Sequence, residues 1–154
     1  MIGNGTYSYK RSGQIYEGEW ANDERSGYGT LFLPVKGPKK ITTTDVATFI
    51  QELKKKQSTR DSGASSTLRK MYAGQWMADK KHGLGTCFYE NGDVYHGSWE
   101  TDMKEGWGQM QFADGSMYEG EWHLGKRHGQ GILLNRKSPL FNCGFCLTRF
   151  SQIY

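Results

Sequence analysis

Residues 95–131 read YHGSWETDMKEGWGQMQFADGSMYEGEWHLGKRHGQG and contain one pattern twice. Tyr95, Gly97 and Trp99 spell Y-x-G-x-W, and a G-x-G begins seven residues after the tryptophan. The second copy starts 23 residues further on, at Tyr118, with the same spacing. Because alternating residues of a strand share one face, the pattern predicts two paired strands in each copy.

The same template occurs four times along the chain, and a fixed period is the signature of a repeat architecture. The last three copies follow one another at 23-residue steps, whereas 56 residues separate Tyr16 from Tyr72, which is one step plus an insertion of 33. A partial copy, G-x-G alone, opens the chain at Gly3. The predicted repeat core consists of Tyr16, Gly18, Trp20, Gly27, Gly29, Tyr72, Gly74, Trp76, Gly83, Gly85, Tyr95, Gly97, Trp99, Gly106, Gly108, Tyr118, Gly120, Trp122, Gly129 and Gly131.

These motifs, in the phrases IYEGEW, MYAGQW, VYHGSW and MYEGEW, resemble the MORN (membrane occupation and recognition nexus) repeat family. The resemblance implies an all-β fold in which tandem β-hairpin repeats form one elongated, twisted antiparallel sheet. Glycines at these strand positions leave room for the aromatic rings of the paired strand. Asn91-Gly92 and Asp114-Gly115 predict type I′ turns that join one repeat to the next.

The repeat pattern divides the chain into four parts. An amphipathic spacing from Val46 to Leu53 predicts a short helix over residues 45–56, and the polar residues 57–70 predict a flexible linker. The C-terminal tail fits either a degenerate capping strand or a foreign C-terminus. The parts are residues 1–33 (a partial repeat and repeat one), 34–70 (a basic insertion), 71–134 (repeats two to four) and 135–154 (the divergent tail).

Charge is distributed unevenly along the chain, whose net charge is +4. The insertion carries nine Lys or Arg against three Asp or Glu, the residues from 132 on carry three Arg or Lys and no acid, and the repeats therefore carry −5. An acidic sheet should be repelled by anionic phospholipid. If the protein contacts a membrane, we expect Lys54, Lys55 and Lys56 beside the predicted helix to make the contact, although such basic runs are commonly only solvated.

No motif of a catalytic or cofactor site is visible, and we expect neither an enzyme nor a bound cofactor. His82 and His128 occupy equivalent repeat positions, and Cys143-x-x-Cys146 lacks the further ligands of a structural zinc site. The three cysteines favour a reducing compartment, and no apolar run is long enough for a transmembrane helix or signal peptide. No nucleic-acid-binding fold is recognisable.

Two functions remain, a scaffold that binds protein partners and, as the alternative, a peripheral phospholipid-binding module. The family resemblance implies a cytoplasmic setting, with association to cytoskeleton, cilium, flagellum or acrosome, as in spermatogenesis; homo-oligomers are compatible with it. On uninterrupted strands, apolar residues beside the glycines point away from the Tyr and Trp side chains. They form a candidate protein-binding face, which either docks a partner or is covered by the insertion or the tail: Tyr28, Phe32, Leu84, Phe88 and Trp107.

Overall fold

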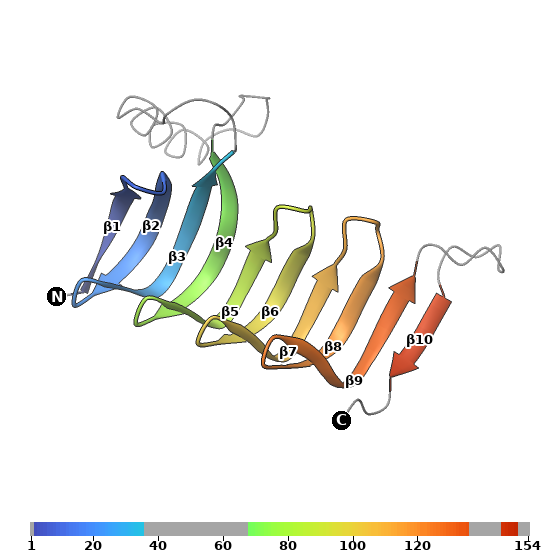
Figure 1. Ribbon diagram of the computed structural model, residues 1–154. Helices are drawn as coiled ribbons and strands as arrows, with labels where there is room; N and C mark the ends of the chain where they lie inside the picture. Colours follow the sequence, from blue (N-terminus) through green and yellow to red (C-terminus); the bar gives the residue numbers. More distant parts are fainter. Residues whose placement is uncertain (1, 36–67, 136–145, 151–154) are drawn as a thin grey trace, which may run out of the picture.

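The computed structural model describes residues 2–35, 68–135 and 146–150, and every regular element in these ranges is a strand. The strands form a single antiparallel sheet in which each pairs with its neighbours in the sequence, so the chain runs as one meander from end to end (Figure 1). The predicted all-β architecture is confirmed. The ten strands are β1 (Ile2–Tyr9), β2 (Gln14–Ala21), β3 (Glu24–Pro34), β4 (Leu68–Met77), β5 (Lys80–Phe88), β6 (Val94–Glu100), β7 (Met103–Gln111), β8 (Met117–His123), β9 (Lys126–Asn135) and β10 (Cys146–Phe150).

Each repeat supplies one hairpin. The Y-x-G-x-W motifs lie on β2, β4, β6 and β8, and the G-x-G motifs lie on β3, β5, β7 and β9. Within a hairpin the glycine of Y-x-G-x-W faces the second glycine of G-x-G, as Gly97 faces Gly108. A Cβ on Gly97 would lie 2.5 Å from the Cα of Gly108, so the two strands approach too closely for any side chain.

A β-bulge beside this glycine pair shifts the register by two residues. Gly97 faces Gly108, yet Trp99 faces Lys104, and the same shift occurs in the other three repeats. Gly106 lies in the bulge with φ +70°, a left-handed conformation that favours glycine. Because the shift is an even number of residues, the alternation of the two faces continues through it, and the faces assigned from the sequence remain separate.

Two-residue turns close the hairpins at one edge of the sheet. Both central residues have positive φ, which defines type I′: Asn22 and Asp23, Ala78 and Asp79, Thr101 and Asp102, and Leu124 and Gly125. The sequence prediction placed type I′ turns elsewhere, at Asn91-Gly92 and Asp114-Gly115, and was wrong. There only the glycines have positive φ, and Gly92 N–H donates to the Tyr89 carbonyl at 3.2 Å, as expected of a longer loop that ends in a glycine bulge.

The core of the protein lies on one face of the sheet. Tyr16, Tyr72, Tyr95 and Tyr118 are each at most 1% exposed, and the tryptophans of repeats two to four are also buried. The rings alternate along the sheet as tyrosine and tryptophan with T-shaped contacts, their centroids 5.0 to 5.5 Å apart. Trp76, Trp99 and Trp122 therefore each contact a tyrosine of their own repeat and one of the preceding repeat. We call this side the aromatic face.

The ends of the array show how far the repeat geometry extends. Gly5 on β1 faces Gly18, and its carbonyl accepts a hydrogen bond from Trp20 Nε1 at 3.3 Å, so the partial N-terminal copy supplies a complete strand. At the other end β10, within the divergent tail, pairs with β9. β4 begins at Leu68, inside the stretch expected to be a linker. The predicted helix over 45–56 lies outside the described residues.

Candidate functional site

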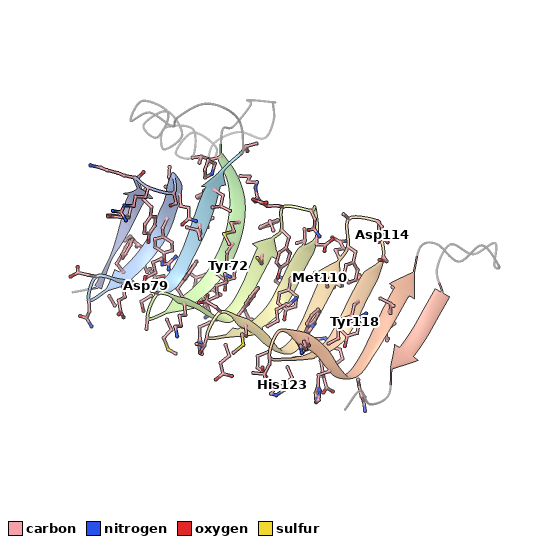
Figure 2. The ribbon with its side chains drawn as sticks, in the orientation of Figure 1. Tyr72, Asp79, Met110, Asp114, Tyr118 and His123 are labelled. Carbon is pink, nitrogen blue, oxygen red and sulfur yellow. The ribbon has the colours of Figure 1, made fainter. Side chains whose placement is uncertain are left out.

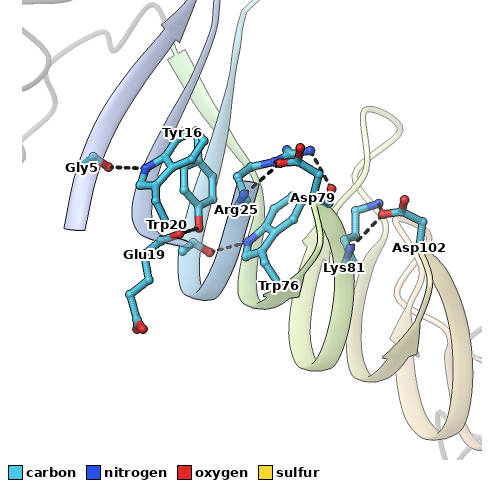
Figure 3. A network of polar contacts seen from close by, with 10 residues as sticks. Gly5, Tyr16, Glu19, Trp20, Arg25, Trp76, Asp79, Lys81 and Asp102 are labelled. Carbon is cyan, nitrogen blue, oxygen red and sulfur yellow. Dashed lines mark hydrogen bonds and ion pairs between the residues drawn. The ribbon is translucent and has the colours of Figure 1, made fainter. Parts of the chain in front are cut away.

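The rings of the aromatic face are held in place by two repeated hydrogen bonds. Each tyrosine hydroxyl donates to the carbonyl three residues further on, as Tyr95 does to Ser98 at 3.0 Å. Each tryptophan Nε1–H donates to the second glycine of the preceding G-x-G, as Trp99 does to Gly85 at 3.1 Å. Polar atoms of buried Tyr and Trp need such partners, so the glycine carbonyls join successive repeats, as Figure 3 shows for Trp20 and Trp76. Figure 2 shows the side chains along the whole sheet, with Tyr72 and Tyr118 labelled.

Burial makes these tyrosine hydroxyls poor acids. It raises the pKa of Tyr16 to about 12, and it raises the pKa values of Tyr72 and Tyr95 well above the ordinary range. A hydroxyl that stays protonated at every physiological pH serves as a fixed hydrogen-bond donor. The aromatic face therefore presents structural donors rather than groups suited to acid–base chemistry.

A second ladder, of cations, lies over the rings. Arg25 stacks on Trp76 at 4.2 Å from the guanidinium carbon to the ring centroid, and Lys81 Nζ lies 4.9 Å from the ring of Trp99. Each cation comes from the strand opposite the tryptophan of its own repeat but contacts the tryptophan of the next. Desolvated contacts of this kind contribute about 2 kcal/mol, so the cations add to the cohesion between repeats.

Aspartates in the type I′ turns pair with two of these cations (Figure 3). Asp79 Oδ1 accepts hydrogen bonds from the backbone N–H and the Nε–H of Arg25, both at 2.9 Å. Asp102 Oδ1 accepts from the backbone N–H of Lys81 at 3.0 Å and lies 3.9 Å from its Nζ. Burial alone would raise the pKa of Asp79, but the hydrogen bonds and charge of Arg25 outweigh it and lower that pKa.

Three of the exposed apolar side chains on the opposite face of the sheet recur at one position of the repeat. Tyr28, Leu84 and Trp107 are 58%, 56% and 54% exposed and occupy the same position in β3, β5 and β7, between the two glycines of each G-x-G. A shallow hollow of about 550 Å³, lined by Tyr28, Leu84, Thr30, Ala73 and Thr86 among others, lies between the first two.

Two members of the predicted binding face differ from this row. Phe32 is only 6% exposed, so its assignment to an accessible row was wrong: it faces Ile15, which is fully buried. Phe88 is half-buried, and Lys70 Nζ lies 6.0 Å from its ring. The accessible row, which we call the exposed row, consists of Tyr28, Leu84 and Trp107.

The acids of the described strands lie on one face of the sheet only, together with Lys80 and Lys126. On the described strands every acid, for example Glu17, Glu19 and Glu119, alternates away from the tyrosines, whereas the charged strand residues on the aromatic face are all basic. The basic set is Arg25, Arg69, Lys81, Lys104 and Arg127. The net charge of −5 therefore does not describe either surface, and repulsion of anionic groups predicted from it does not apply to the aromatic face. Lys54, Lys55 and Lys56 lie outside the described residues.

The other reactive side chains of the described residues make separate contacts. Cys87 is buried in the core, and burial raises the pKa of its thiol. His123 Nδ1 lies 2.8 Å from Glu105, and His96 Nδ1 lies 2.8 Å from Thr86. Within the ranges that the structure describes, no three His, Cys, Asp or Glu side chains could together hold a metal, and no helix could cross a membrane.

Sequence reasoning missed the cation and carboxylate ladders. Both were visible as positions of the repeat. A Lys or Arg stands five residues after the tryptophan of each Y-x-G-x-W motif, and an aspartate stands three residues after that tryptophan in the first three motifs. The aspartate positions lie in turns whose other residues, such as Ala78 and Thr101, are unusual in type I′ geometry. The turns were therefore not recognised, and neither was the role of their carboxylates.

Comparison with known proteins agrees with this geometry. The model of the MORN repeat matches residues 16–34, 72–94, 95–117 and 118–135, more than half of the chain. MORN repeat-containing protein 3 of Xenopus laevis is 40% identical over 87 residues, which are 56% of this chain. They are only 25% of the relative, so the chain spans about a quarter of its length.

Proposed function

Because the chain belongs to the MORN repeat family, we propose that it is a non-catalytic scaffold that holds protein partners on its open sheet. The proposal agrees with the contents of the aromatic face, where tyrosine, tryptophan and cation side chains are engaged with one another and with backbone carbonyls.

The observation that carries the proposal is the exposed row. Three apolar side chains at equivalent positions of alternate strands stand about 10 Å apart along the sheet, since two strands separate each from the next. Rigid aromatic side chains on a flat surface are the anchors that dominate many protein interfaces. A partner that docks on the row would bury Tyr28, Leu84 and Trp107 without disturbing the core on the other side.

The family resemblance extends the proposal to a setting. We place the scaffold in a cytoplasmic or cytoskeletal assembly, with cilia, flagella and the acrosome as the structures to examine. Peripheral binding of anionic phospholipid is the alternative function, with the basic insertion around Lys54 as the contact.

The test is affinity purification from native tissue with three forms of the full chain. The first is the wild type, and the second carries Tyr28→Ser, Leu84→Ser and Trp107→Ser together. The third is a control with Met77→Ser and Met103→Ser, which removes exposed apolar side chains at the turn edge. We expect the wild type and the control to retain the same partners and the triple variant to lose them.

Identical partners on all three forms would contradict a role for the exposed row. Sedimentation with phosphatidylserine vesicles in the same buffers tests the alternative, because binding through the basic insertion should weaken as ionic strength rises. Vesicle binding by the wild type without any retained protein would favour the lipid-binding function over the scaffold.

A further inference from the structure

Successive repeats are joined in part by a turn carboxylate, and this contact is present at the first two junctions but not at the third. At the first junction Asp79 accepts the backbone N–H of Arg25, and at the second Asp102 accepts that of Lys81. In both, the second residue of the type I′ turn thereby neutralises a cation stacked on a tryptophan. At these two junctions the group that fits beside the cation is therefore a carboxylate.

The third junction lacks this carboxylate. Gly125 occupies the turn position with φ +78°, close to the +64° of Asp79 and the +68° of Asp102, and a Cβ built on it would have nothing within 4 Å. The turn is still anchored, because Gly125 N–H donates to the Lys104 carbonyl at 3.0 Å. The place of the third aspartate is therefore open space.

Lys104 keeps the position of a ladder cation all the same. Its Nζ lies 4.1 Å from the ring of Trp122, 5.3 Å from that of Tyr95 and 5.7 Å from that of Tyr89. Within the described residues no carboxylate pairs with this ammonium group. Burial lowers its pKa, although the charge of Asp93 acts in the other direction, so a second anion in direct contact would further stabilise the ammonium group.

A hollow of about 430 Å³ joins the two features. Its wall includes both Lys104 and Gly125, with Trp99 and Met71 as apolar parts. The other charged groups in the wall are already paired, Arg69 with Glu90 at 3.0 Å and Lys81 with Asp102. Lys104 is thus the cation in this wall that forms no ion pair in the described part of the chain, and Asp93 acts on it only through its charge.

We propose that this hollow on the aromatic face binds an acidic side chain of a protein partner, whose carboxylate takes the place beside Lys104 that Asp79 and Asp102 take beside the earlier cations. A carboxylate fits because it can accept the backbone N–H and form an ion pair with the ammonium group, as Asp102 does for Lys81. The apolar wall suits a leucine or similar residue next to the acid. The site rests on the scaffold function but lies on the face opposite the exposed row.

The experiment measures fluorescence polarisation of a short labelled peptide that contains glutamate and leucine, with a glutamine version as its control. Full-length wild type is compared with Lys104→Gln, with Gly125→Asp, and with Lys126→Gln as a matched loss of an exposed lysine on the opposite face. We expect Lys104→Gln and Gly125→Asp each to weaken binding about tenfold or more. Lys104→Gln removes the ammonium group, and Gly125→Asp places a carboxylate of the protein itself beside that group. Lys126→Gln should bind as the wild type does.

The Gly125→Asp variant separates binding from folding. It adds the carboxylate that the other junctions contain, so its thermal midpoint should stay at or above that of the wild type while the peptide is excluded. Equal binding of the glutamine peptide, unchanged binding by Lys104→Gln, or no binding by the wild type would overturn the proposal. Binding of phosphatidylserine vesicles with the same dependence on Lys104 would assign the site to a lipid headgroup instead.

The scaffold function itself is tested separately. The triple serine variant of the exposed row should bind the peptide normally, because none of its changes lies on the aromatic face. Loss of native partners by that variant with retained peptide binding would support both proposals.

Discussion

The two faces of one repeat use the same side chain for opposite purposes. Trp99 on β6 is 5% exposed and donates its Nε1–H to Gly85, whereas Trp107 on β7 is 54% exposed. The two indoles belong to the same hairpin and differ in the side of the sheet to which strand alternation assigns them. The face of a residue, rather than its hydrophobicity, therefore decides whether it serves the fold or remains available to a partner.

Charge follows the same division. Arg25 and Lys81 on the aromatic face are stacked on rings and paired with turn aspartates, so these two cations belong to the architecture of the repeat. Acids on the opposite face lie between and beside the exposed apolar residues. A substitution in the ring ladder of the aromatic face should therefore affect stability, and one in the exposed row should leave stability unchanged, which leads to four measurements.

The largest effect is expected at Trp99. Trp99→Ala should lower the free energy of unfolding by roughly 3 to 5 kcal/mol, because it removes a buried ring that contacts both Tyr72 and Tyr95. Trp20→Ala should cost less, since that ring is only partly buried and has no preceding core tyrosine of a complete repeat. Urea unfolding of the two variants measures the difference, and an unchanged midpoint for Trp99→Ala would contradict the structural role of this face.

A smaller loss is expected where a methyl group is added beneath a ring. Gly108→Ala should lower stability by about 1 to 3 kcal/mol, because its Cβ would overlap the hydroxyl and ring edge of Tyr95. Gly3→Ala is the matched control, since its Cβ would have nothing within 4 Å. Thermal unfolding in which both variants behave alike would show that ring and backbone do not approach as closely as the structure has them.

The turn carboxylates should contribute less. Asp79→Ala should lower stability by about 0.5 to 1 kcal/mol near pH 7, because this carboxylate is half-exposed and solvent screens its pairing with Arg25. Hydrogen bonds hold the folded pKa of Asp79 below its unfolded value of about 3.9. Its contribution is thus present above that value and is lost as the pH falls through the folded pKa. The gap between wild type and variant should close in acid, and a gap independent of pH would refute the assignment.

The smallest effect on stability is expected at Trp107. Trp107→Ser should change the free energy of unfolding by less than about 0.5 kcal/mol, as expected of a surface position away from the core. The same denaturant titration should include Trp99→Ala. Both variants remove a tryptophan from one hairpin, so the difference between them measures the effect of the face. A loss comparable to that of Trp99→Ala would show that the exposed row is part of the core.

Periodicity was sufficient to predict the sheet, its hairpins and the side on which Tyr95 and Trp99 lie, because spacing by two is a direct geometric property of a strand. It could not predict the closing turns, since Ala78 and Leu124 adopt positive φ against their own preference and are held there by the neighbouring repeat. Contacts between repeats are not a local signal. The same limit hid the pairing of Asp102 with Lys81.

The burial of Phe32 was missed for a related reason. Alternation places it correctly on the side opposite Tyr16, but alternation says nothing of which part of that side is accessible. The exposed row therefore contains only those predicted residues that lie between the two glycines of a G-x-G. The Lys104 hollow was also out of reach, because it depends on the absence of a carboxylate at Gly125, a position whose importance appears only after Asp79 and Asp102 are seen in place.

The two edges of the sheet differ in how much sequence change they can accept during evolution. At the type I′ edge two residues close each hairpin, and Asp79 N–H and Asp102 N–H donate to the strand of the preceding repeat, so an added residue would pull both apart. At the other edge the loops lie between repeats, and the 33-residue insertion occurs there, between β3 and β4, while Trp76 Nε1 still reaches Gly29 at 3.1 Å. New segments, and with them new binding specificities, should accumulate along one margin only.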